Sequence, residues 1–187
     1  MPPSLDASAV RAWCRLSLRA LGRAREEIDA INVYPVADGD TGTNLYLTVE
    51  SAAQAVDAVF EAHATTGPPA ASRPTLPEAF RAMSHGALIG ARGNSGTILA
   101  QLLRGMNQVI AAPAATREGD ADRAAADAGA AADHAAAGAL RQALRVAAES
   151  AYEAVARPVE GTMLTVAMGA ADAARDTAGG LAEVARA

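Results

Sequence analysis

The chain is organised around residues 32–44, which read NVYPVADGDTGTN. Asp38 and Asp40 stand one residue apart, and Gly39 between them permits a tight bend of the backbone. Carboxylates at i and i+2 of such a turn can converge on one hard divalent cation. A helical pattern follows directly, so we expect free N–H groups at its start to face a metal-bound phosphate. A plain turn in which Asp40 caps the helix is the alternative, and these residues alone leave both open.

Two well-known sites that use similar residues are excluded. An EF-hand calcium loop also begins with Asp-x-Asp, but its sixth-position glycine would be Thr43 and its closing glutamate would be Val49. A Walker A phosphate loop needs a lysine, and all 16 basic residues of this chain are arginines. A lysine Schiff base is excluded for the same reason.

The composition of the 187-residue chain indicates one domain, spanning residues 1–187. Hydrophobic residues make up 51% of the chain and aromatics only 3%, and most of the apolar content is alanine, which favours helices. A net charge of −5 argues against nucleic acid as a partner. No apolar run reaches the roughly 18 residues of a transmembrane helix. Because Cys14 is the sole cysteine and the N-terminus lacks signal-peptide features, we expect a cytoplasmic protein.

Helical periodicity recurs along the chain, and no segment alternates as a strand does. Over residues 6–30 we expect a helix capped by Asp6 or Ser8, with Trp13 and Cys14 in the core. Thr75 and Glu78 match a capping box with Pro77 in the first turn. The other helices are expected over residues 43–61, 76–88, from 96 onward, from about 140 to 157, and 163–175, with a few helical residues near 187.

Residues 112–135 are dominated by Ala, Asp, Gly and Arg and contain no large apolar side chain. Such a segment cannot bury enough surface to hold a fixed place, so we expect a flexible loop insertion. With six or so helices joined by turns, the expected fold class is all-α, an antiparallel up-and-down bundle with functional loops at the turns.

Two further glycine-containing turns open helices. In residues 93–96 (GNSG), Asn94 or Ser95 can cap the helix, and the glycines let backbone approach a ligand closely. In the second turn, Thr162 can cap a helix or touch a ligand, and Met163 can pack in the core or seat a base. The three histidines have no metal-ligand spacing and no evident partner, so we expect no catalytic histidine.

Together, residues 32–44, 90–105 (GARGNSGTILAQLLRG) and 157–166 (RPVEGTMLTV) resemble the DhaL-like (DAK2) domain. Within that family they look most like the ATP-binding subunit of bacterial fatty acid kinases. The resemblance covers roughly residues 30–175. It implies an antiparallel barrel of about eight helices, with ATP or ADP and paired Mg²⁺ ions at one end.

The resemblance also implies roles for individual residues. It places the metal ions on Asn32, Asp38 and Asp40, and the catalytic groups on Asp38, Asp40 and Thr43. It implies nucleotide contacts at the remaining motif positions, which are Thr41, Gly42, Asn44, Gly93, Asn94, Ser95, Gly96, Thr162 and Met163.

The activity implied is transfer of the γ-phosphoryl group of ATP to a fatty acid, which a separate DegV-type binding protein presents, to give an acyl phosphate. A fatty acid carboxylate is already ionised near neutral pH and needs no general base, which agrees with the absence of a placed histidine. Kinases of this type extend further, so we expect a fold that is incomplete at its C-terminus and dimerisation through regions beyond Ala187. Two alternatives remain: a dihydroxyacetone kinase L-type subunit, whose branch prefers aspartate where this chain has Asn32, and a non-catalytic nucleotide-binding module.

Overall fold

The computed structural model describes residues 5–66, 73–112 and 128–187, and these parts are helical with no strand. The expected all-α fold is therefore confirmed. The helices, in chain order, are α1 (Ala7–Ala30), α2 (Thr41–Thr66), α3 (Leu76–Ile89), α4 (Gly93–Ile110), α5 (Ala128–Glu153), α6 (Met163–Asp176) and α7 (Leu181–Val184).

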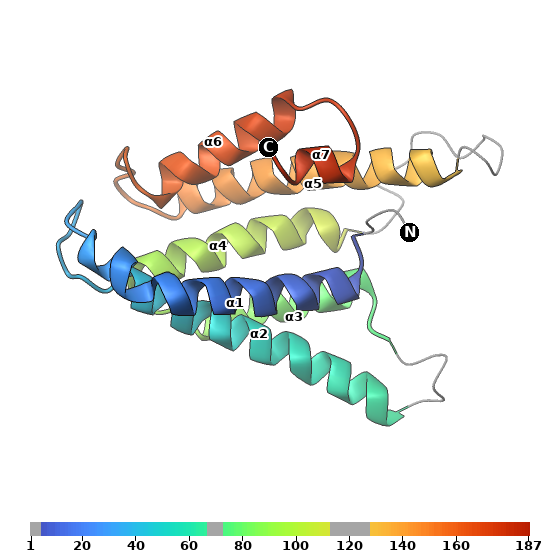
Figure 1. Ribbon diagram of the computed structural model, residues 1–187, viewed down its shortest axis with the longest axis horizontal. Helices are drawn as coiled ribbons and strands as arrows, with labels where there is room; N and C mark the ends of the chain where they lie inside the picture. Colours follow the sequence, from blue (N-terminus) through green and yellow to red (C-terminus); the bar gives the residue numbers. More distant parts are fainter. Residues whose placement is uncertain (1–4, 67–72, 113–127) are drawn as a thin grey trace.

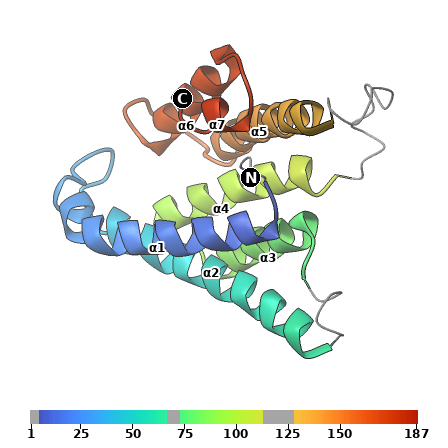
Figure 2. The same ribbon diagram turned by 45° about the vertical axis from the view of Figure 1, so that its right-hand side comes forward.

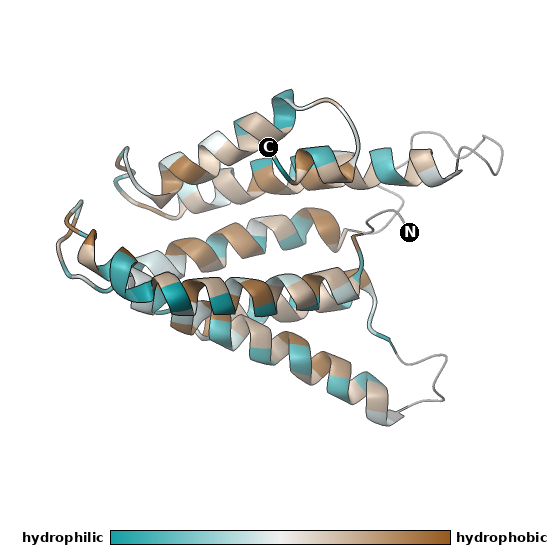
Figure 3. Ribbon diagram, viewed as in Figure 1, coloured by the Kyte–Doolittle hydropathy of each residue, from teal (hydrophilic) through white to brown (hydrophobic). Residues whose placement is uncertain are grey.

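Helix α4 lies between two groups of helices (Figures 1 and 2). It packs on α2 and α3 on one side and on α5 on the other, while α1 completes the first group and α6 and α7 cover α5. Figure 3 shows α4 as apolar along much of its length, whereas the visible side of α1 alternates with hydrophilic residues. A central helix needs apolar side chains on more than one face, which is what α4 supplies.

Small residues bring these helices close together. A Cβ added at Gly105 of α4 would lie 2.6 Å from the carbonyl oxygen of Val146 in α5, so only glycine fits there. The main core combines Met83, Leu103 and Ile110 with many alanines. Alanine-rich faces let helix backbones approach closely, and this explains how a chain with few aromatics builds a dense core.

The helices alternate in direction, so α2, α4 and α6 begin at the same end of the molecule (Figure 1). The three sequence motifs are the turns that lead into these three helices. Each helix N-terminus carries a partial positive charge from its dipole and its unpaired N–H groups. The fold therefore gathers the three motifs, and three positive helix ends, in one region.

Several expected helix ends are confirmed. The Asp6 carboxylate caps α1 by accepting the Ala9 N–H at 2.8 Å. Thr75 and Glu78 form the expected capping box at the start of α3. The described residues contain no helix long and apolar enough to cross a membrane.

Helix α2 is longer than expected at both ends, since it runs over Thr41–Thr66 rather than residues 43–61. It starts earlier because side chains from α1 and the following turn accept its first N–H groups. It continues past Glu61 through alanines, which are strong helix formers, and His63 there lies 3.8 Å from a Glu78 carboxylate oxygen of α3.

The expectation of a loop over residues 112–135 is wrong from Ala128 onward, where α5 begins. Alanine has the highest helix propensity, and its small side chain fits the close contact of α5 with α6 and α7. Ala137 is fully buried against Ala174 and Val184, and the Asp133 carboxylate accepts the Leu181 N–H at 3.2 Å. Residues 113–127 lie outside the described residues. At its other end α5 stops at Glu153, earlier than the expected 157.

Two side-chain expectations are also wrong. Trp13 is 46% exposed. The buried face of α1 consists of Ala7, Val10 and Cys14, and Trp13 points away from that face. Cys14 is buried as expected, and desolvation raises its pKa to about 12. Neither Asn94 nor Ser95 caps α4, since the helix has already begun at Gly93 with Arg92 at the cap position.

Candidate functional site

A groove with a volume of about 860 Å³ opens between the starts of α2, α4 and α6. Asn32, Asp38 and Thr41 line it from the first motif. Asn94 and Ser95 line it from the second. The third motif contributes Thr162, Met163 and their neighbours. Residues more than 120 positions apart in the chain thus share one groove.

The N-terminus of α2 is closed by side chains of the protein itself. Asp29, near the end of α1, accepts the Thr43 N–H at 3.1 Å and the Thr43 hydroxyl at 2.7 Å. Asn32 accepts the Thr41 N–H at 3.1 Å through its carboxamide oxygen. The N–H groups expected to be free for phosphate are therefore already satisfied.

A chain of hydrogen bonds joins the first motif to the second. The Thr41 hydroxyl donates to the carboxamide oxygen of Asn32, so it can only accept from Ser95, whose hydroxyl lies 3.2 Å away. The other end of the Asn32 side chain donates to the Val36 carbonyl oxygen at 2.7 Å. Asn32 thus fixes the turn and links it to the start of α4, and its oxygen has two donors before any metal approaches.

Within residues 5–66, 73–112 and 128–187, no side-chain hydrogen bond of this kind is found at Asp38 or Asp40. Asp38 is exposed on the groove and Asp40 is half-buried. Across the residues that the structure describes, no arginine forms an ion pair with either carboxylate. The Asp38 carboxylate on the groove and the Asp40 carboxylate two residues further along the same turn fit Mg²⁺, which proteins often hold through one or two carboxylates together with phosphate oxygens and water. The described residues contain no group of three or more His, Cys, Asp or Glu side chains that could hold a metal without such help.

The glycines of the first two motifs serve close packing. Gly93 has a φ of +56°, and a Cβ there would lie 2.2 Å from the Asn44 carboxamide nitrogen. A Cβ at Gly96 would lie 2.3 Å from the Thr48 hydroxyl oxygen. A Cβ at Gly42 would lie 2.3 Å from the Arg25 carbonyl oxygen. These glycines bring α4 against α2 and α2 against α1, and none of the three lines the groove.

The N-terminus of α4 differs from that of α2. Its cap residue, Arg92, makes no side-chain hydrogen bond to the helix, and Asn94 is exposed on the groove. An uncapped helix start offers N–H groups and a positive dipole end to an anion. Of the two turns, this one suits phosphate.

The third motif forms a turn that caps α6. The Thr162 hydroxyl donates to the Val159 carbonyl oxygen at 2.8 Å and accepts the Leu164 N–H at 3.3 Å, which confirms the expected cap. Leu164 is buried, while Met163 is half-buried and lines the groove. Together with Val155 and Val159, these side chains make this wall of the groove largely apolar.

The sequence-predicted site residues thus divide into two sets. Asn32, Asp38, Thr41, Asn94, Ser95, Thr162 and Met163 line the groove. Asp40, Gly42, Thr43, Asn44, Gly93 and Gly96 lie in the first two motifs but do not line the groove.

Sequence reasoning missed Asp29. The Thr43 hydroxyl, more than any other group, holds the pKa of the Asp29 carboxyl below its usual value, assisted by the Thr43 and Gly42 N–H groups and by Arg25. A useful signal was its place in the last turn of α1. A carboxylate there is unfavourable for its own helix but can cap the next helix after a hairpin turn.

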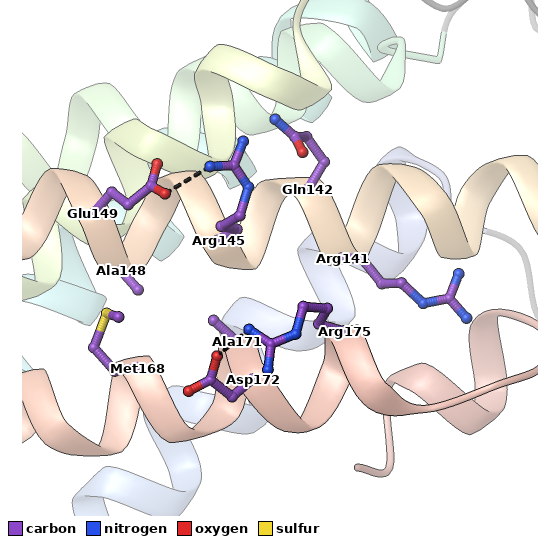
Figure 4. Close-up of a pocket in the computed structure, with 9 residues that line it drawn as sticks. All are labelled: Arg141, Gln142, Arg145, Ala148, Glu149, Met168, Ala171, Asp172 and Arg175. Atoms are coloured by element: carbon purple, nitrogen blue, oxygen red, sulfur yellow. Dashed lines mark hydrogen bonds and ion pairs between the residues drawn. The ribbon is translucent and has the colours of Figure 1, made fainter.

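A second cavity, of about 380 Å³, lies on α5 and α6 (Figure 4). Its arginines are already engaged: Arg145 pairs with Glu149 at 2.6 Å and Arg175 with Asp172 at 2.7 Å. Arg141 donates to carbonyl oxygens at the end of α6. The larger groove is therefore the better candidate for a functional site.

The chain is similar to a known domain family and to several curated proteins. Residues 35–187 match the model of the DAK2 domain. Protein YloV of Bacillus subtilis is 38% identical over 168 residues, which is 90% of this chain and 25% of YloV. An uncharacterized protein of Staphylococcus saprophyticus is 37% identical over 150 residues, covering 79% of this chain and 21% of the relative. An uncharacterized protein of Staphylococcus epidermidis is 38% identical over 149 residues, or 80% and 21%.

The chain thus spans about a fifth to a quarter of the length of these curated relatives. DAK2 domains are nucleotide-binding modules of kinase-associated families, and they typically bind ADP or ATP. Apart from residues 32–34, the match covers all three motifs. On this evidence the chain belongs to the DAK2 (DhaL-like) domain family.

Proposed function

We propose that this chain is the ATP- and Mg²⁺-binding domain of a kinase that phosphorylates a fatty acid to an acyl phosphate. The observation that carries the proposal is the single groove on which all three motifs meet. One wall presents the carboxylate of Asp38, another presents the uncapped start of α4, and a third is apolar around Met163. A nucleotide has a matching order of parts: metal, phosphates and base.

Asp38 and Asp40 would hold Mg²⁺, which neutralises charge on the phosphates. The start of α4, with Asn94 and Ser95, would hold the phosphate oxygens, and Met163 would lie against the base. Asn32 would keep the turn in place rather than bind metal, because its oxygen already accepts from the Thr41 N–H and hydroxyl. Thr43 would act in the same supporting way, through Asp29.

A carboxylate acceptor agrees with the composition of the groove. Phosphoryl transfer depends mainly on positioning and charge neutralisation, and an ionised carboxylate requires no base. No histidine lines the groove in the described part of the chain. A hydroxyl acceptor such as dihydroxyacetone gains more from a base, so we favour the fatty acid.

The fatty acid would come from a DegV-type binding protein in the cytoplasm. Ile31, Val33, Tyr34 and Val36 are each more than half exposed beside the groove, and clustered exposed apolar side chains favour a protein partner. Figure 3 shows apolar segments in this turn after α1. Dimerisation would involve other regions of a longer protein.

Nucleotide binding is tested by thermal unfolding of the chain with ATP and Mg²⁺. At a hundred times the dissociation constant, a ligand adds about 2.7 kcal/mol, which for this size corresponds to a rise in Tm of roughly 5–10 °C. Asp38→Ala and Asp40→Ala should abolish the part of the rise that depends on Mg²⁺. Absence of any shift in the folded, unmodified chain would contradict the proposal.

Substrate class is tested separately, in the full-length protein. Acyl phosphate should form from ATP and a fatty acid loaded on a DegV-type protein, and dihydroxyacetone on its own binding subunit should remain unphosphorylated. The reverse result would assign the chain to the dihydroxyacetone branch. Nucleotide binding without turnover of either acceptor would make it a non-catalytic module.

A further inference from the structure

The two ends of the loop that carries Asp38 and Asp40 are joined by a residue outside the three motifs. Asp29 lies one residue before the end of α1, and its carboxylate binds both the N–H and the hydroxyl of Thr43 in the first turn of α2. One side chain therefore fixes the start of α2 to the end of α1, across the whole of residues 31–40.

The aspartate turn itself folds back onto the same place. A Cβ added at Gly39, which has a φ of +63°, would lie 3.8 Å from the Asp29 carbonyl oxygen. At Gly42 the backbones of α1 and α2 are closer still, because a Cβ there would meet Arg25 and Asp29. The turn between Asp38 and Asp40 thus packs against Asp29, the residue that joins the two ends of the loop.

Asp29 also takes over a role that would otherwise fall to Asp40. Asp40 directly precedes α2, where an aspartate side chain normally caps the helix by accepting its first N–H groups. In the described residues those N–H groups bond to Asp29 and Asn32, and no side-chain hydrogen bond joins Asp40 to the helix. The Asp40 carboxylate is left available for a cation.

We infer that Asp29 is a positioning residue for the metal site: it closes the 31–40 loop and caps α2, so that Asp40 joins Asp38 on one divalent cation. The inference rests on the proposed function. Asp29 does not line the groove, so it acts through the loop and through Asp40 rather than on the ligand. Without Asp29, the Asp40 carboxylate turns to the vacant N–H groups of α2 and is lost to the metal.

The test is binding of Mn²⁺ to the whole chain, measured by electron paramagnetic resonance without nucleotide and again with saturating ADP. Asp29→Ala should weaken Mn²⁺ affinity by tenfold or more, as loss of a group that orients a metal ligand commonly costs about 10–100-fold. Glu27→Ala is the matched control, because it removes the same charge from an exposed position of the same helix end. Its effect should stay within about twofold.

A double-variant cycle separates positioning from loss of structure. In an Asp40→Asn background, Asp29→Ala should weaken Mn²⁺ binding little further, because both changes remove the same carboxylate from the metal. Thr43→Val removes the hydroxyl that donates to Asp29 and keeps the backbone N–H that also donates to it, so it should weaken binding in the same direction but by less than Asp29→Ala. This variant keeps the test open if Asp29→Ala does not fold.

The outcomes are distinguishable. Unchanged Mn²⁺ affinity in Asp29→Ala, or a loss no larger than that of Glu27→Ala, overturns the inference and leaves the proposed function standing. Equal losses in the presence and absence of the Asp40 carboxylate also overturn it, because Asp29 would then act independently of Asp40. A folded, unmodified chain that binds neither Mn²⁺ nor ATP with Mg²⁺ overturns the inference and the proposed function together.

Discussion

The first turns of α2 and α4 face the same groove, yet one is closed and the other open. At α2, Asp29 and Asn32 accept the leading N–H groups, and both side chains come from the end of α1 or just beyond it. At α4, Arg92 stands at the cap position and gives the helix no side-chain acceptor. Two helix starts with the same intrinsic dipole thus present different chemistry to a ligand.

The difference indicates a division of labour. A closed helix start has its N–H groups satisfied, so it suits the loop whose carboxylates we propose as cation ligands. An open start has unsatisfied N–H groups, so it suits an anion. The hydrogen bond between Ser95 and Thr41 joins the two helix starts, and it would hold the proposed cation and anion positions at a fixed separation.

Of the substitutions considered, Gly93→Ala should have the largest effect on the contact between the starts of α2 and α4. The new Cβ would need a left-handed backbone conformation and would overlap the side chain of Asn44. Backbone strain and overpacking of this kind each cost about 1–3 kcal/mol, so we expect the free energy of unfolding to fall by roughly 2–4 kcal/mol. Chemical denaturation measures the change.

Gly138→Ala is the matched control for that experiment. Gly138 is an exposed glycine in the interior of α5, and a Cβ there would meet nothing within 4 Å. Replacing it should stabilise the protein by about 0.5–1 kcal/mol, because alanine has the higher helix propensity. Equal effects of the two substitutions would show that Gly93 is not needed for the contact between α2 and α4.

Thr48→Val tests the buried link behind the two helix starts. The Thr48 hydroxyl is fully buried, accepts the Arg92 N–H at 3.2 Å and donates to the Asn44 carbonyl oxygen at 2.7 Å. Valine keeps the shape but leaves the Arg92 N–H unpaired, at a cost of about 1–3 kcal/mol. Denaturant unfolding should show this loss, whereas Thr65→Val, at an exposed hydroxyl of the same helix, should change stability by less than about 0.5 kcal/mol. A Thr48→Val protein as stable as the unmodified chain would show that the Thr48 hydroxyl does not stabilise the contact between α2 and the start of α4.

Local signals predicted much of this fold. The period of apolar residues located the helices, and the caps at Asp6, Thr75 and Thr162 were predictable because each lies beside the helix that it caps. The family resemblance indicated which turns meet. Alanine-rich segments were less predictable, because low complexity suggested a loop where residues from Ala128 onward form a helix with a partner to pack on.

The parts that could not be predicted depend on contacts between segments. Asp29 caps a helix 12 residues away, which no local capping pattern includes. The glycines at 93 and 96 suggested close approach of a ligand, but the structure shows close approach of side chains from α2. Trp13 was placed in the core by residue type, although the helix turns it outward. Residue type indicates what chemistry is available, and the packing decides which group uses it.

Acid provides the mildest way to sharpen the comparison, because it opens the closed helix start without any mutation. The pKa of Asp29 in the folded protein is lowered from 3.8, chiefly by the Thr43 hydroxyl. Its ionised form therefore contributes stability that is fully present above pH 3.8 and is lost as the pH falls through the lowered pKa. Asp29→Asn should have a lower Tm than the unmodified chain at about pH 6, and the gap should narrow in strong acid.

The matched control is Glu27→Gln, at an exposed carboxylate of the same helix end, whose Tm should follow that of the unmodified chain across the titration. Glu78 also has a lowered pKa because of its bonds to Thr75, so the unmodified chain loses stability in acid at α3 as well. Asp29→Asn retains the loss of stability at α3. The difference in Tm between Asp29→Asn and the unmodified chain therefore reports on the start of α2 alone. A gap that stays constant with pH would mean that the charge of Asp29 does not hold the start of α2, and the contrast with α4 would then be one of shape alone.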